Sequence, residues 1–170
     1  QKMERAYLAR NFIAVICGKY DDVNIEFIEK HMRFDGSIRY IEIELAVDML
    51  DEEFSDEEKR ACQRKLADMC IEYLADNADH CIFDVSGKEK IYDIGFVYCD
   101  FMAEESLKTE KEYLESFLMY LREEAQIPVI MLAGKKVDNI RSIAKSYSTA
   151  CILRSCQGFK NRKDIYYYDE

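Results

Sequence analysis

The sequence predicts an α/β fold, and three patterns carry this prediction. Residues 91–134 hold an apolar run, a long amphipathic segment and a second apolar run, the pattern of a strand, a crossover helix and a strand. Residues 38–47 end in an alternation of apolar and mostly acidic side chains, with the period of two that is typical of a strand. Thr109 and Glu112 have the spacing of a capping box, which places the start of the crossover helix. We therefore expect strands and helices to alternate along the chain.

The predicted elements follow one another in nearly the order of a five-stranded flavodoxin-like sheet. They are strands at 38–47, 80–85, 94–99, 128–133 and 149–154, and helices at 55–75, 109–126 and 137–147. Residues 94–99 are apolar almost throughout, as expected for a central parallel strand that is covered on both faces. Residues 38–47 also fit a helical period, which stays the alternative there. This order predicts a single three-layer domain with a mainly parallel sheet.

Residues 1–37 are expected to form a helical extension that packs on an α/β domain spanning residues 38–170, the two making one folding unit. Good helix formers precede an apolar run within residues 3–17, and they favour a helix there over a buried strand. Asp21 or Asp22 can cap a second helix. The sequence therefore predicts two helices ahead of the first strand.

The composition is that of an ordinary globular domain. The chain has 170 residues, of which 49% are hydrophobic and 34% are charged. A chain of this size can bury a hydrophobic core without the support of disulfides or metal ions. No apolar run approaches the ~20 residues that a membrane-spanning helix needs, and the first residues lack the apolar stretch of a signal peptide. The seven cysteines are odd in number and include no CxxC pair, which favours free thiols over disulfides or a zinc site. We expect a cytosolic protein.

The net charge of −10 hides an asymmetry along the chain. Residues 1–133 hold 30 acids and 16 bases, whereas residues 134–163 hold eight bases and a single acid. Such a split predicts an acidic face around 48–58 and a basic face around 135–163, each with its own partner. The candidate binding residues are Asp48, Asp51, Glu52 and Glu53 on the acidic side and Lys135, Lys136, Arg141, Arg154, Lys160, Arg162 and Lys163 on the basic side.

The last fifteen residues mix three bases with aromatic side chains. Such a mixture can bind single-stranded nucleic acid, because the bases attract the phosphates and the aromatic rings stack on the nucleobases. It is also typical of an edge strand or of a tail folded over the sheet, which is the interpretation we favour. Direct binding of nucleic acid is therefore expected only through this basic C-terminal region.

Two segments in the middle of the chain, FDVSGKEKIYDIGFVYCD and LREEAQIPVIMLAG, resemble the receiver domains of bacterial response regulators. Receivers carry a Ser-Gly, then a Tyr-Asp and a strand that ends at the phospho-acceptor Asp, and later an Ile-Pro-Val-Ile strand. The resemblance covers about residues 38–156. It implies a receiver-like fold, with Asp100 as candidate phosphoacceptor and Asp48 and Asp51 as candidate ligands of Mg²⁺.

The chain also departs from the receiver pattern at several positions. Met49 stands where the second acid of a metal-binding pair would fall, and Tyr98 stands in register with the phosphoacceptor, two residues before Asp100. Ala133 replaces the hydroxyl residue, and Arg154 replaces the lysine of the last strand. A receiver-type fold without its chemistry would act as a binding surface.

The leading hypothesis is a cytosolic, non-enzymatic regulatory domain that binds another protein and needs no cofactor. One alternative is a small acidic inhibitor of a nucleic-acid enzyme, of the kind phages use against host defence, whose carboxylates imitate DNA phosphates. A second alternative is a phosphoacceptor domain that uses Mg²⁺. Convergence of Asp48, Asp100 and Arg154 at the carboxyl edge of the sheet would favour that chemistry. The motifs GxGxxG, GxxxxGK[ST], GxSxG and HExxH do not occur.

Overall fold

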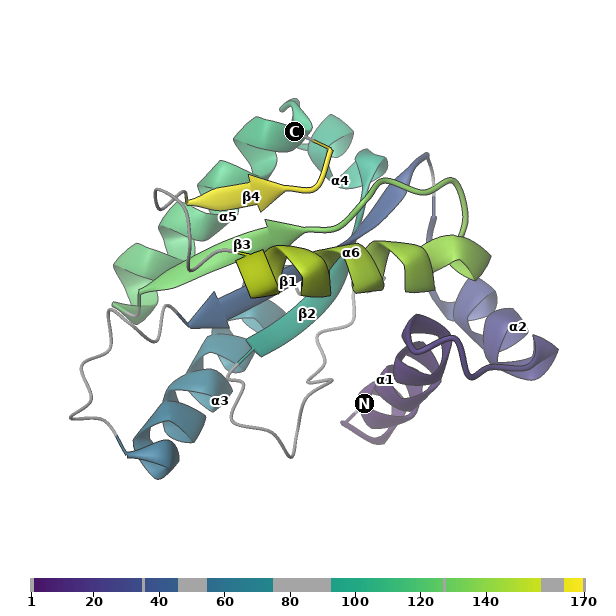
Figure 1. Ribbon diagram of the computed structural model, residues 1–170, viewed down its shortest axis with the longest axis horizontal. Coiled ribbons are helices and arrows are strands. Elements are labelled where there is room, and N and C mark those ends of the chain that lie inside the picture. Colours follow the sequence, from purple (N-terminus) through teal and green to yellow (C-terminus); the bar gives the residue numbers. More distant parts are fainter. Residues whose placement is uncertain are drawn as a thin grey trace.

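A computed structural model of the chain describes residues 2–34, 36–45, 55–74, 93–126, 128–156 and 164–169 (Figure 1). Its elements, in chain order, are α1 (Lys2–Ile16), α2 (Asp22–His31), β1 (Ile38–Leu45), α3 (Asp56–Leu74), β2 (Asp93–Cys99), α4 (Asp100–Glu105), α5 (Glu110–Ala125), β3 (Val129–Ala133), the 3-10 helix η1 (Ile140–Ser142), α6 (Ile143–Cys156) and β4 (Ile165–Tyr167). The predicted α/β class is confirmed. The strand predicted at 80–85 lies outside the described residues.

The strands form one mixed sheet in the order β2-β1-β3-β4. β1 runs antiparallel to both of its neighbours, and only β3 and β4 pair in parallel. The prediction of a mainly parallel sheet is therefore wrong. β2, α5 and β3 do form the expected strand, helix and strand, and β2 and β3 run in the same direction, but β1 lies between them. A period of two identifies a strand without specifying its neighbours or its direction.

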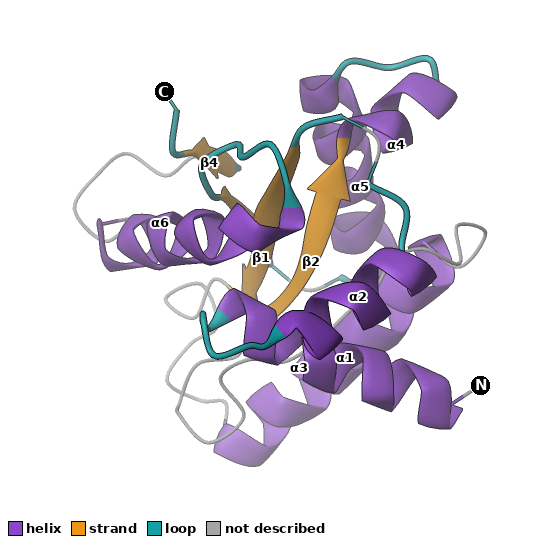
Figure 2. Ribbon diagram, turned by 90° about the vertical axis from the view of Figure 1, so that its right-hand side faces the viewer, coloured by secondary structure: helices purple, strands orange, loops and turns teal. Residues whose placement is uncertain are grey.

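Helices cover both faces of the sheet (Figure 2). α6 packs on β1 and β3 from one side, where the rings of Tyr40 and Tyr147 meet edge to face at 5.0 Å. α3 and α5 pack on the other side, where the rings of Phe96 and Phe117 lie 5.5 Å apart. α1 packs against α2 and α6, and Phe12 is fully buried in the same hydrophobic cluster as the sheet. Burial of these large side chains is the main force that holds the layers together.

The predicted ends of several helices agree with the structure. α2 begins after Asp21, whose side chain accepts a hydrogen bond from the backbone N–H of Asn24 at 3.1 Å. α5 begins after Thr109, which forms the predicted capping box with Glu112. Residues 2–16 are helical, as favoured over a strand. These ends depend on contacts between residues close in the sequence, which the sequence itself displays.

The helix predicted at 137–147 is confirmed in part, since η1 and the start of α6 cover residues 140–147. The strand predicted at 149–154 is wrong, because α6 continues through these residues to Cys156. Its buried stripe contains the small residues Ser146, Thr149 and Ala150, so the helix lies close to the sheet. A Cβ placed on Gly134 would come within 2.0 Å of the carbonyl oxygen of Ser146. A buried stripe of small and β-branched residues resembles a strand when it is judged by apolar content alone.

The C-terminal region supplies the edge strand β4, as favoured in the sequence interpretation. β4 pairs with β3 in parallel, with Ile165 beside Met131 and Tyr167 beside Ala133. No helix in the described part of the chain is long and apolar enough to cross a membrane.

A candidate polar site at the carboxyl edge of the sheet

The strand directions bring five charged side chains to one edge of the sheet. β2, β3 and β4 end there, and β1 begins there, because β1 runs opposite to the other three. We define the edge cluster as Arg39 at the start of β1, Asp100 after β2, Glu110 in the first turn of α5, Lys136 after β3 and Asp169 after β4. The residues are distant in sequence and meet only through the fold.

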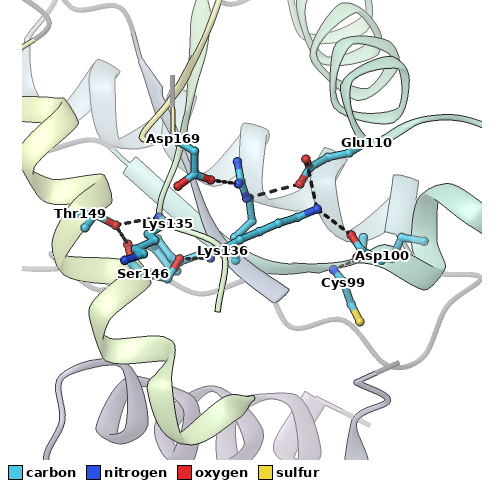
Figure 3. A network of polar contacts seen from close by, with 11 residues as sticks. Cys99, Asp100, Glu110, Lys135, Lys136, Ser146, Thr149 and Asp169 are labelled. Carbon is cyan, nitrogen blue, oxygen red and sulfur yellow. Dashed lines mark hydrogen bonds and ion pairs between the residues drawn. The ribbon is translucent and has the colours of Figure 1, made fainter. Parts of the chain in front are cut away.

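The cluster is a chain of alternating charges (Figure 3). Lys136 Nζ lies 3.2 Å from Asp100 Oδ1 and 3.6 Å from Glu110 Oε2. Arg39 Nε lies 3.3 Å from Glu110 Oε1, and Arg39 Nη2 donates to Asp169 Oδ2. Two cations thus face three carboxylates, and Glu110 connects the two halves of the chain.

Arg39 is the buried centre of the cluster, with only 2% of its surface exposed. It lies opposite Tyr98 of β2, and its guanidinium carbon is 5.6 Å from the ring centroid of Tyr167. Its Nη1 is buried and has no hydrogen-bond partner among the described residues. A buried cation is costly unless carboxylates compensate it. Glu110 and Asp169 provide that compensation.

Close backbone contacts position the two halves of the Lys136–Asp100 pair. The backbone N–H of Lys135 donates to Thr149 Oγ1 at 2.8 Å, which holds the chain between β3 and η1 against α6. On the other side, the backbone N–H of Asp100 donates to the carbonyl of Ser37 at 3.2 Å. Gly36 packs there with a positive φ of +94°, a conformation that favours glycine. Lys136 and Asp100 therefore project from constrained backbone.

Tyr98 lies beneath the cluster and is not an acid–base group at ordinary pH. Burial raises the pKa of its phenol strongly, and the nearby carboxylates of Glu110 and Asp100 raise the pKa further. Burial likewise raises the pKa of Tyr113, whose ring lies 5.8 Å from that of Tyr98. Both phenols stay protonated, so these two side chains add no charge to the edge cluster.

The structure brings together only some of the residues singled out from the sequence. Asp100 and Lys136 form an ion pair, but Arg154 does not reach this edge. Arg154 instead pairs with the fully buried Glu42 at 2.7 Å, on the face covered by α6. The convergence of Arg154 with Asp100 is therefore not observed. The candidates Asp48, Asp51, Glu52, Glu53, Lys160, Arg162 and Lys163 lie outside the described residues.

Three members of the edge cluster were missed by sequence reasoning: Arg39, Glu110 and Asp169. One signal was available for Arg39, because it is the single base in the strand IRYIEIEL. A base within a strand that packs on both faces needs an acidic partner. Nothing in the sequence indicates that the partners are Glu110 and Asp169.

A second feature is the separation of charge between the two sides of the sheet. Residues 100–125, which contain α4 and α5, carry eight acids and three bases. Residues 134–156, which lead into and form α6, carry five bases and one acid. α5 and α6 cover opposite faces of the sheet (Figure 2), so the segments of opposite charge lie on opposite sides of the molecule.

The acidic surface on α5 is not the acidic face predicted around 48–58, of which residues 48–54 lie outside the described residues. From here on, acidic face and basic face refer to the following exposed residues. The acidic face consists of Glu112, Glu115, Met119, Glu123 and Glu124 on α5 together with Glu72 on α3. The basic face consists of Lys135, Arg141, Lys145 and Ile152. Arg141 makes an exposed ion pair with Asp22 at 3.2 Å, whereas Lys145 makes no ion pair with any described residue.

Comparisons with protein-family models, curated proteins and solved structures find no match to this chain. Within the described residues, no group of three or more His, Cys, Asp or Glu side chains could hold a metal ion. The six cysteines that the structure describes are free thiols. Function is therefore inferred from the charges and contacts of the chain itself.

Proposed function

We propose that the chain is a non-enzymatic regulatory domain that binds another protein through its two oppositely charged faces. The observation that carries this proposal is the separation of charge across the sheet, with α5 acidic on one side and α6 basic on the other. Charged surfaces of one sign attract complementary partners and set the orientation of binding. Two such surfaces on opposite sides allow the domain to contact two partners at once.

Apolar and aromatic side chains accompany the carboxylates of the acidic face. Met119 is 50% exposed in the middle of α5. On the same pair of helices, the half-buried rings of Tyr73 on α3 and Tyr120 on α5 lie 4.7 Å apart. Partial burial and the carboxylates of Glu72 and Glu124 raise the pKa of Tyr120. Tyrosine and methionine are enriched at protein interfaces. The carboxylates of the acidic face attract a partner with a basic surface.

The edge cluster supports a structural role better than a reactive one. Each of its cations already contacts two carboxylates, so the positive charge is neutralised within the protein. These ion pairs connect the ends of β2, β3 and β4 to the start of β1. Such a cluster fixes the strands on which α5 and α6 pack.

Partner capture from the native host tests the proposal. The wild-type chain is immobilised beside Glu115→Lys/Glu123→Lys, which alters the acidic face, and Lys145→Glu, which alters the basic face. Lys30→Glu on the exposed side of α2 is the matched control for Lys145→Glu. We expect a protein that the wild type and the control retain and that one face variant loses. Identical captured sets for all four chains would contradict the proposal. A nucleic-acid enzyme captured through the acidic face would specify the inhibitor form of this function.

A second candidate function, phosphoacceptance at Asp100, is favoured by one contact. Lys136 Nζ lies 3.2 Å from Asp100 Oδ1, and a cation beside a carboxylate can stabilise a transferred phosphoryl group. The receiver resemblance adds Asp48 and Asp51 as candidate ligands of Mg²⁺. Incubation with acetyl phosphate and Mg²⁺ should then add about 80 Da per phosphoryl group to the intact mass. No gain, or a gain that survives Asp100→Asn, would exclude this function.

A further inference from the structure

We infer that the acidic face of one copy of the chain binds the basic face of a second copy, through α5 of the first and α6 of the second. The inference rests on the proposed protein-binding function and names one partner for it. Four observations carry it: the spacing of the exposed residues on the two helices, the sign of their charges, the matching register of the charges, and the placement of the two helices on opposite sides.

Each helix presents an outward stripe with one half-exposed apolar side chain. On α5 the stripe is Glu112, Glu115, Met119 and Glu123, and on α6 it is Lys145, Ser148, Ile152 and Ser155. Met119 is 50% exposed and Ile152 is 51% exposed. Residues three and four apart lie on one side of a helix, so each stripe can contact a partner helix along its length. An exposed apolar residue in the middle of a polar stripe provides a contact that excludes water.

The charges of the two stripes are opposite and do not cancel within one chain. α6 contains no acidic residue, and its bases are Lys145 and Arg154. The bases of α5 are Lys111 and Arg122. Lys111 makes no ion pair with any described residue, and the Arg122 guanidinium donates to the carbonyl of Val129 at 2.8–3.0 Å and pairs with Asp164. Neither Lys145 nor Glu115 makes an ion pair with any residue that the structure describes. Both charges therefore remain available to a second molecule.

The spacing of charge and apolar residue is the same on both helices. Glu112 precedes Met119 by seven residues, and Lys145 precedes Ile152 by seven residues. Seven residues are about two turns of an α-helix. When the helices lie parallel with Met119 against Ile152, Lys145 comes beside Glu112 and, in the next turn, Glu115. One alignment thus satisfies the apolar contact and the charge contact together.

The opposite placement of the faces determines the type of assembly. α5 and α6 lie on opposite sides of the sheet, so a chain cannot pair its own two faces. Contact between unlike faces is head-to-tail, and it extends into an open chain or closes into a ring. A single pair of helices buries less than the ~1,600 Å² of a standard interface, so the association is weak and sensitive to salt.

The test is sedimentation velocity of the full chain over a range of concentrations, at low and at high salt. We expect the wild type to associate at low salt and to dissociate at high salt. Glu115→Lys and Lys145→Glu should each abolish association, because either change places like charges across the contact. Glu115 is preferable to Glu112 as the test position, because the Glu112 carboxylate already accepts the backbone N–H of Thr109 at 3.0 Å.

The decisive sample is an equal mixture of the two variants. Each altered face is complementary to the altered face of the other variant, and each unaltered face is complementary to the other unaltered face. The mixture should therefore associate again although neither variant does so alone. Lys30→Glu, which makes the same change of net charge as Lys145→Glu, should associate like the wild type.

The inference would be overturned by a wild type that stays monomeric at low salt, by single variants that associate like the wild type, or by a mixture that fails to associate. Binding of a different protein to the acidic face, with no association of the chain itself, would also overturn it. In that last case the proposed protein-binding function stands. A chain that neither associates nor captures a face-dependent partner contradicts both.

Discussion

Arg39 in the edge cluster and Lys145 on the basic face show two uses of a positive charge in one molecule. Arg39 is buried and contacts Glu110 and Asp169, whereas Lys145 is exposed and makes no ion pair with any described residue. A buried cation requires its partners within the same chain, because it cannot be solvated. An exposed cation is solvated at little cost and remains free to contact another molecule. We therefore expect changes at the edge cluster to alter stability, and changes at the faces to alter association.

The largest loss of stability is expected when Arg39 keeps its charge and loses its partners. The double variant Glu110→Gln/Asp169→Asn leaves a buried guanidinium between neutral side chains of nearly the same shape. We expect the free energy of unfolding to fall by about 3 kcal/mol, as for other broken buried ion pairs. Urea denaturation followed by circular dichroism measures this loss. A decrease below about 0.5 kcal/mol, the usual size of a surface effect, would show that the cluster does not stabilise the fold.

A smaller loss is expected when the buried cation itself is removed. Arg39→Met places an apolar side chain at the buried position and leaves two carboxylates that are partly exposed to water. Because these carboxylates can be solvated, the free energy of unfolding should fall by only about 1 kcal/mol. The same denaturation experiment compares the two variants. If Arg39→Met lowered the free energy of unfolding more than the double variant does, compensation of the buried guanidinium would not be the main contribution of the cluster to stability.

The capping box of α5 is a local contact outside the edge cluster, and its contribution to stability should depend on pH. Hydrogen bonds from Thr109 lower the pKa of Glu112 below the ordinary value of 4.5. A carboxyl whose folded pKa is lowered stabilises the protein above its unfolded pKa, and this stabilisation disappears as pH falls through the folded pKa. Glu112→Ala should therefore be less stable than the wild type at neutral pH, and the difference should vanish in acid. A difference that persists unchanged at acidic pH would indicate that the carboxylate is not the cause.

The smallest effect on stability is expected at the charged faces. Glu115→Lys and Lys145→Glu change exposed side chains, so the free energy of unfolding should stay within about 0.5 kcal/mol of the wild type. Urea denaturation at high salt, where the chain is expected to be monomeric, isolates this effect from association. A loss as large as that of Arg39→Met would mean that these residues support the fold rather than the binding surface.

The sequence predicted local structure better than the arrangement of the strands. The capping box of Thr109 and Glu112 correctly placed the start of α5, because the contact joins neighbours in the chain. The apolar runs correctly placed β2 and β3. The position of β1 between them was missed, since the pairing of Ile41 with both Phe96 and Ala133 joins distant segments.

The error at α6 has a different physical cause. Residues 149–154, TACILR, are mostly apolar or β-branched, which is the pattern of a strand. In the structure, Thr149 accepts the backbone N–H of Lys135 at 2.8 Å, and Ser146 accepts that of Tyr40 at 2.8 Å. These side-chain hydroxyls satisfy backbone donors at the sheet and let the helix approach closely. Such contacts depend on the packed fold and are not visible as a sequence period.

For the candidate site, the sequence alone indicated the basic segment at 134–163 and singled out Asp100 and Lys136, but its predicted acidic face at 48–58 is not the one on α5. The basic segment and the two residues could be singled out because charge sign and the ends of apolar runs are local properties of the chain. The packed fold was needed to show that Lys136 rather than Arg154 pairs with Asp100, and that α5 and α6 present opposite charges on opposite sides of the sheet. One reason is that residues 143–156 form α6, which keeps Arg154 on one face of the sheet beside Glu42. Another is that β1 reverses direction relative to the other three strands. This reversal brings Arg39 to the edge where β2, β3 and β4 end, and no pattern of neighbouring residues specifies it.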